Sequence, residues 1–176
     1  MSKLSGLLGI AIAGVLSSVP ATAAPLASHA GGCARGGGGS ALLVQVGGFK
    51  ARRGMLRVQT YGGDPGSFFE KGAYIDRIEV PVPASGLAQL CIPLRHGGVY
   101  AVSVRHDMDG DRKSGRADGG GMSGNPRLSL TDLLFKRKPP AEDVSVRVGN
   151  GVTPVSITLN YIQGMAFRPI LQSAGR

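Results

Sequence analysis

Four aspartates are gathered in a short stretch of this chain, directly after a run of alternating apolar residues. Asp107, Asp109 and Asp111 stand at every second position, and Asp118 stands where a calcium loop of about twelve residues has its last ligand. Ca²⁺ takes about six to eight oxygen ligands, and alternate carboxylates on an extended loop can surround one ion. The spacing therefore predicts a Ca²⁺ site formed by these four side chains.

A solvated turn without an ion is the alternative for the same loop. The sixth position of a calcium loop normally carries glycine, whose positive φ allows a sharp turn, but this chain has Arg112 there. Arg112, Lys113 and Arg116 also offset most of the negative charge of the aspartates. No flanking helices are predicted, so a bound ion is expected to stabilise the loop and not to switch a conformation. The sequence leaves both alternatives open.

His106 lies immediately before the aspartates, at the end of the alternating run. A histidine on the inward face of a strand is expected to be structural and hydrogen-bonded to loop backbone. A hydrolase that uses His106 with Asp107 or Asp109 is the alternative, but adjacent residues of a strand point to opposite faces. We therefore predict no catalytic residue and expect a non-enzymatic protein.

The alternating run predicts the strand that positions these residues. Tyr100, Val102 and Val104 share one face of this strand with His106. The same period of two predicts further strands at 42–46, 55–61, 74–82, 87–94, 144–148 and 155–161. Residues 122–140 are expected to form one long irregular loop, with at most a short helix at 130–135. About seven short strands with glycine-rich turns predict an all-β fold, an antiparallel β-sandwich of the transthyretin-like or immunoglobulin-like type.

The first 24 residues have the three parts of a secretory signal peptide: Lys3, an apolar run, and small residues at Ala21 and Ala23. No later segment is long and apolar enough to span a membrane. We therefore expect a periplasmic or secreted protein with no transmembrane segment after signal removal. The expected organisation after the signal is a flexible Gly/Ala-rich leader at 25–40, the sandwich domain at 41–164 and a C-terminal tail at 165–176.

Cys33 and Cys91 are the two cysteines of the chain. In an oxidising compartment an even number of cysteines usually pairs. We therefore predict a disulfide between Cys33 and Cys91, which would tie the glycine-rich leader to the sandwich domain.

The chain is basic, with a formal net charge of +9. Its basic residues cluster at 52–53, 112–116 and 136–138. Such a charge attracts anionic surfaces through a salt-dependent field, so binding to anionic envelope glycolipid is an alternative function. The clusters lack interleaved aromatic residues for base stacking, so nucleic acid is not expected as a partner.

The chain resembles a bacterial exported family, known as domain of unknown function 2141, in three segments: LRHGGVYAVSVRHDMDGD, KPPAEDVSVRV and VSITLNY. The resemblance covers most of the chain after the predicted signal peptide. It implies export and a β-sandwich related to the transthyretin and carboxypeptidase-regulatory domains. It implies no reaction, because the activity of that family is not established.

The acidic loop departs from the pattern of this family. Asp109 and Asp111 replace residues that are usually asparagine, which would make a cation site more acidic, and Arg112 replaces the usual glycine. Ala141 stands where an aromatic residue is expected. We expect an exported, non-enzymatic module for binding or accessory functions in the cell envelope, with the acidic loop as its functional element.

Overall fold

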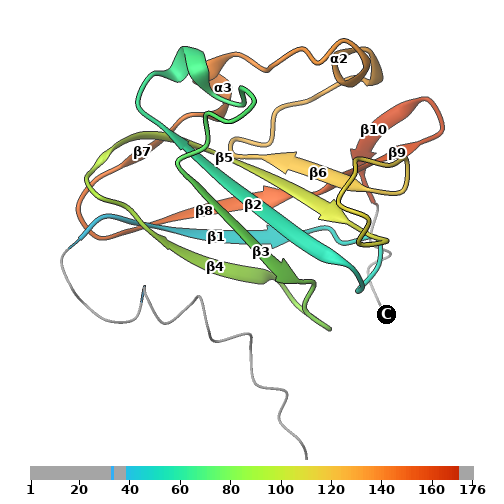
Figure 1. Ribbon diagram of the computed structural model, residues 1–176, viewed down its shortest axis with the longest axis horizontal. Coiled ribbons are helices and arrows are strands. Elements are labelled where there is room, and N and C mark those ends of the chain that lie inside the picture. The colour runs from blue at the N-terminus through green and yellow to red at the C-terminus, as the bar shows by residue number, and fades with distance from the viewer. Residues whose placement is uncertain (1–32, 34–38, 171–176) are drawn as a thin grey trace, which may run out of the picture.

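Two β-sheets that pack face to face form the described part of the protein (Figure 1). The computed structural model describes residue 33 and residues 39–170. The smaller sheet has the strand order β4–β1–β8, with β1 at Ala41–Gly47, β4 at Ala88–Pro93 and β8 at Val152–Thr158. In this sheet β1 pairs antiparallel with β4 and parallel with β8.

The larger sheet has the order β10–β9–β6–β5–β2–β3, and β7 pairs antiparallel with one end of β5. Its strands are β2 (Met55–Gly62), β3 (Asp76–Pro81), β5 (Gly98–Asp107), β6 (Gly119–Met122), β7 (Val146–Val148), β9 (Asn160–Gln163) and β10 (Ala166–Pro169). The helices within residues 39–170 are short: η1 (Pro65–Ser67), α2 (Leu130–Leu134) and α3 (Ala141–Val144). The predicted all-β sandwich is confirmed.

The core lies between the sheets and consists mainly of valine, leucine and isoleucine. In β1, Leu42, Val44 and Val46 are fully buried and alternate with half-buried Leu43 and Gln45. Burial of a side chain of this size stabilises the fold by about 1.5–3 kcal/mol. The strand faces that the period-two pattern predicts are therefore the faces that hold the sheets together.

The last predicted strand, 155–161, is divided between the two sheets. Its inward residues are buried as predicted, but the chain leaves β8 of the smaller sheet after Thr158 and enters β9 of the larger sheet at Asn160. At the crossing, the Leu159 backbone N–H donates to the Gly47 carbonyl at 3.0 Å. The pattern of burial continues across this point, so alternation alone does not reveal the change of sheet.

Two strands of the larger sheet are absent from the sequence-based expectation. β6 reads Gly-Gly-Gly-Met and lacks the branched and aromatic side chains that are typical of strands. β10 follows a turn at Gly164, whose φ of 63° lets the chain fold back onto β9. The sandwich therefore continues to Pro169, whereas the predicted domain ends at residue 164.

A disulfide joins Cys33 to Cys91 of β4, with their Cα atoms 5.6 Å apart. This confirms the predicted pairing. The expected signal peptide and most of the expected leader lie outside the described residues. Across the described part of the chain, no helix is long and apolar enough to cross a membrane.

Candidate functional site

Strand β5 ends by placing two ionisable side chains on opposite faces of the larger sheet. His106 points into the core and is fully buried, whereas Asp107 points toward the loop that follows. This division follows from the period of two in a strand. The two residues therefore belong to two separate hydrogen-bond networks.

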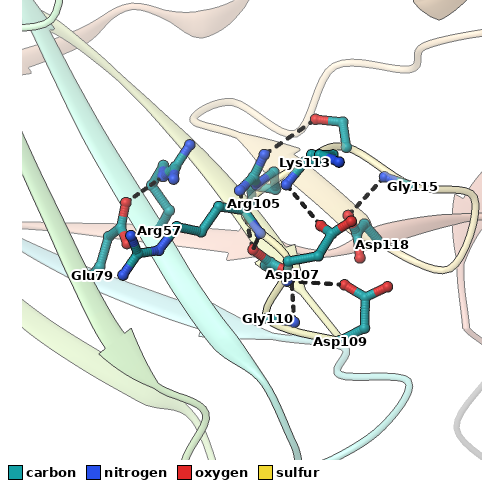
Figure 2. A network of polar contacts seen from close by, with 12 residues as sticks. Arg57, Glu79, Arg105, Asp107, Asp109, Gly110, Lys113, Gly115 and Asp118 are labelled. Carbon is teal, nitrogen blue, oxygen red and sulfur yellow. Dashed lines mark hydrogen bonds and ion pairs between the residues drawn. The ribbon is translucent and has the colours of Figure 1, made fainter.

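The carboxylate of Asp107 organises the first half of the loop (Figure 2). Its Oδ1 accepts the Gly110 backbone N–H at 2.8 Å, and its Oδ2 accepts the Arg112 backbone N–H at 2.8 Å. The Arg105 guanidinium donates to Oδ2 at 3.2 Å. Burial of Asp107 acts to raise the pKa of its carboxyl, but the two backbone donors and the Arg105 charge outweigh it, and the pKa lies below its usual value.

The carboxylate of Asp118 organises the second half of the loop. Its Oδ1 accepts the Met108 backbone N–H at 3.0 Å, and its Oδ2 accepts the Gly115 backbone N–H at 2.8 Å. Only 8% of Asp118 is exposed. Because Met108 and Gly115 lie in different parts of the loop, Asp118 holds the start of the loop against its end.

Three of the four predicted metal ligands lie together, and the fourth does not. Each of Asp107, Asp109 and Asp118 has a carboxylate oxygen within 4.8 Å of the oxygens of the other two. Asp111 lies outside this acidic cluster. Its Oδ1 instead accepts the Lys113 backbone N–H at 2.7 Å, which forms an exposed turn within the loop.

The acidic cluster retains free acceptor capacity. A carboxylate has about four lone-pair positions, of which Asp107 uses three for donors of the protein and Asp118 uses two. Asp109 is exposed and accepts one hydrogen bond, from the Asp111 backbone N–H at 3.3 Å. Hard cations such as Ca²⁺ bind carboxylate oxygens at about 2.3–2.6 Å, so oxygens 4.8 Å apart can both reach one ion.

Arg112 adopts a turn that is costly for any residue other than glycine. Its φ is 65°, in the left-handed region, and Gly110 has a φ of 75°. For a residue with a side chain this conformation costs roughly 1–2 kcal/mol. The hydrogen bond from the Arg112 N–H to Asp107 offsets part of this cost. The sixth position of the loop thus has the positive φ that a calcium loop needs there, although it carries a positive charge.

A row of charged residues on the outer face of the larger sheet leads to the cluster (Figure 2). Arg57 of β2 lies directly opposite Arg105 of β5, and these like charges are each paired with a carboxylate. Arg57 Nε lies 2.6 Å from Glu79 Oε1, and Arg105 Nη2 lies 3.2 Å from Asp107 Oδ2. Arg105 therefore lowers the net negative charge beside the cluster.

His106 belongs to the core and not to the acidic cluster. Its Nε2 lies 2.8 Å from the Arg53 carbonyl, and its Nδ1 lies 2.6 Å from the hydroxyl of Tyr161. A carbonyl can only accept, so Nε2 carries the proton and Nδ1 accepts from Tyr161. The Tyr161 hydroxyl in turn accepts the Lys50 backbone N–H at 3.1 Å. Full burial and two occupied ring nitrogens favour the structural role of His106 and give a substrate no access to it.

Two residues of these networks, Arg105 and Tyr161, are not among the site residues predicted from the sequence. Arg105 stands two positions before Asp107, and this spacing on a strand places both on one face, so the signal was present. Tyr161 is included only as the last residue of the predicted strand 155–161. No local signal connects Tyr161 to His106, because 55 positions separate them and the pairing depends on the order of strands in the sheet.

The chain matches the model of a known protein family. The family model described as an uncharacterized protein conserved in bacteria (DUF2141) matches residues 44–156, which run from β1 into β8 and include the whole acidic loop. No curated protein matches the chain. No solved structure matches it either. The match spans more than half of the chain, so this protein belongs to the DUF2141 family of bacterial proteins.

Proposed function

We propose that this protein is an exported, non-enzymatic module of the cell envelope whose acidic loop binds Ca²⁺. The observation that carries the proposal is the convergence of Asp107, Asp109 and Asp118 within 4.8 Å of one another. The ion would take its carboxylate ligands from these three residues, with Asp111 outside. Backbone carbonyls or water would complete the usual coordination.

Preorganisation of two ligands supports this assignment. Asp107 and Asp118 are fixed by backbone donors before any ion arrives, so binding need not order them. Asp109 is exposed and completes the cluster from the solvent side. The ion would thus stabilise a loop that is already formed. Sites of this kind outside the cell bind Ca²⁺ with dissociation constants of about 10⁻⁴–10⁻³ M.

The thermal midpoint of unfolding in Ca²⁺ and then in chelator tests the proposal. At a concentration about ten times the dissociation constant, a ligand specific for the folded state stabilises it by about 1.4 kcal/mol. We expect a higher midpoint in Ca²⁺ and a smaller rise in Mg²⁺, which demands a stricter octahedral geometry. Coincident curves in Ca²⁺ and chelator would contradict Ca²⁺ binding.

Asp109→Asn and Asp111→Asn form a matched pair for this experiment. Both residues are exposed, both accept a backbone N–H two positions ahead, and asparagine keeps an acceptor for that bond in each case. Each substitution removes one negative charge from the same loop. We expect D109N to lose most of the Ca²⁺-dependent rise and D111N to retain most of it. An equal loss of the Ca²⁺-dependent rise in both variants would mean that the rise depends on the total charge of the loop. That result would contradict an ion site formed by Asp107, Asp109 and Asp118.

Export is proposed from the signal-like N-terminus and is supported by the disulfide between Cys33 and Cys91. The proposed relation to transthyretin-like and carboxypeptidase-regulatory domains rests on the family resemblance and is compatible with the two-sheet architecture. Fractionation of producing cells tests export. We expect the chain in the periplasm or medium, with both cysteines resistant to alkylation until a reductant is added. A cytoplasmic chain with free thiols would contradict this part of the proposal.

A further inference from the structure

Helix α2 and the residues after it form an exposed surface that is both apolar and basic. We call Leu134, Phe135, Lys136, Arg137 and Lys138 the α2 tip. Leu134 is 77% exposed and Phe135 is 70% exposed, and the three basic residues that follow are also exposed. In Figure 1 this segment lies at the margin of the molecule, away from the contact between the sheets. The sandwich therefore folds without burying these two large apolar side chains.

Local hydrogen bonds fix the shape of the α2 tip. At the start of α2, before the tip, Ser129 and Asp132 form a reciprocal capping box. At its end, the Lys136 N–H donates to the Leu133 carbonyl and the Arg137 N–H donates to the Asp132 carbonyl at 2.8 Å. This is the hydrogen-bond pattern of a Schellman motif. Leu134 and Phe135 are thus held outward by a defined turn.

The motif carries a lysine where glycine would be less strained. Lys136 has a φ of 51°, and glycine is the usual residue at this position. Replacing the usual glycine adds a positive charge directly beside Phe135. The Arg137 guanidinium lies 5.5 Å from the centre of the Phe135 ring, so charge and apolar surface are in contact.

The acidic neighbours do not cancel the charge of the α2 tip. Lys138 Nζ lies 3.0 Å from Glu70, and Arg137 lies 4.0 Å from Asp132, but both pairs are solvent-exposed. Exposed ion pairs of this kind are weak and exchange readily with other anions. Lys136 has no ion pair within residues 39–170. The whole chain, at +9, adds to the attraction for a negative surface.

We infer that the α2 tip binds the surface of an anionic lipid bilayer. Leu134 and Phe135 enter the boundary between headgroups and acyl chains, while the basic residues lie against lipid phosphates. A protein interface normally takes about 20–30 residues from each partner, whereas the α2 tip has five. A bilayer needs only a short apolar projection flanked by positive charge, which is what this segment offers.

This inference is independent of Ca²⁺ binding by the acidic loop. The α2 tip and the acidic cluster share no residue. A chain carrying Asp109→Asn is therefore expected to bind vesicles as the native chain does. Failure of one assignment leaves the other unaffected.

Sedimentation with unilamellar vesicles tests the inference. We expect the exported chain to sediment with vesicles of equal parts phosphatidylcholine and phosphatidylglycerol, and not with phosphatidylcholine alone. Added salt weakens the binding because the attraction is partly electrostatic. Leu134→Ser combined with Phe135→Ser is expected to weaken binding about tenfold or more. Val152→Ser, which alters an exposed apolar residue at the start of β8, is expected to leave it unchanged.

A second pair of variants separates the local basic cluster from the net charge of the chain. Lys136→Gln with Lys138→Gln removes two positive charges from the α2 tip, and Arg116→Gln with Arg147→Gln removes two exposed charges elsewhere. We expect the first pair to weaken binding severalfold more than the second. No sedimentation of the native chain with either vesicle, or equal effects of the two pairs, would overturn the inference. Unchanged melting curves establish that each variant is folded.

Discussion

The Nδ1 atom of His106 lies 2.6 Å from the hydroxyl oxygen of Tyr161, and this contact joins β5 to β9 inside the core. The same two side chains also hold the connection between β1 and β2, through the Arg53 carbonyl and the Lys50 N–H. A polar network of four groups thus fixes one end of an otherwise apolar core. Because every donor in it has an acceptor, the network stabilises one arrangement of the strands.

Tyr161→Phe is expected to lower the free energy of unfolding by about 1–3 kcal/mol, because it leaves the Lys50 N–H and His106 Nδ1 without their partner. Chemical denaturation measures the change. Tyr61→Phe is the control, since Tyr61 is also buried and its hydroxyl makes no hydrogen bond within the described part of the chain. Equal losses in the two variants would contradict the role of the network.

The alkaline limit of stability should also depend on Tyr161. Burial raises the pKa of Tyr161 above its ordinary value of 10.0, against smaller lowering effects of the Lys50 N–H and the Arg52 charge. Above pH 10 the unfolded chain loses this proton while the folded chain retains it, so stability falls as the pH rises. The decrease should be smaller in Tyr161→Phe than in the native protein. Denaturation midpoints across the alkaline range measure both.

Asp107→Asn should destabilise the folded state by about 1–3 kcal/mol at neutral pH, because an amide cannot accept all three donors that reach the carboxylate. The pKa of Asp107 is lowered in the folded state, so its contribution is present above the unfolded pKa and is lost as the pH falls through the folded value. The difference between native protein and variant should therefore narrow in acid. A constant difference from neutral to acidic pH would show that Asp107 contributes through packing alone.

Gly119→Ala should destabilise the protein by about 1–3 kcal/mol through overpacking. A Cβ atom at Gly119 would lie closer than 3.0 Å to the Tyr161 ring, which the fully buried tyrosine cannot relieve easily. Gly120→Ala is the matched control on the other face of β6, where the nearest atoms are 3.7 Å away. Urea denaturation of both variants compares them. Similar losses would mean that β6 needs glycine for its backbone and not for the space it leaves to Tyr161.

Thr60→Val should be neutral or stabilising, by up to about 1 kcal/mol. Thr60 is fully buried, and its hydroxyl has no hydrogen-bond partner within residues 39–170. Replacing an unsatisfied hydroxyl by a methyl group of similar size removes a desolvation cost. Ser123→Ala is the contrasting variant, because its buried hydroxyl accepts from the Val102 N–H and donates to the Val144 carbonyl. We expect this second change to destabilise, and the opposite ranking would be inconsistent with the observed contacts.

The alternation of apolar and polar residues correctly predicted those features that are set within a single strand. The alternation that ends at His106 predicted β5, its buried face and the structural environment of the imidazole. The crossing at Leu159 was not predictable in this way, because a residue buried between two sheets is apolar whichever sheet it pairs with. β6 was missed because glycine carries no strand signal, and the reason for glycine at position 119, its contact with the Tyr161 ring, lies 42 residues away in the sequence.

The acidic cluster was likewise predictable from the sequence only in part. Spacing predicted that Asp107, Asp109 and Asp118 converge, and the structure brings them together. The spacing also placed Asp111 among the metal ligands, but its carboxylate accepts the Lys113 N–H instead. Gly110 and Arg112, on either side of Asp111, both have a positive φ, and the arginine gave no indication of such a turn. The sequence likewise did not predict that backbone N–H groups donate to the carboxylates of Asp107 and Asp118.

The passage of one continuous chain from β8 to β9 has a mechanical consequence. Separating the two sheets would break the hydrogen bond from the Leu159 N–H to the Gly47 carbonyl, because Leu159 alone connects β8 to β9. We therefore expect the two sheets to open together, and amide protons in both should exchange through a common global opening.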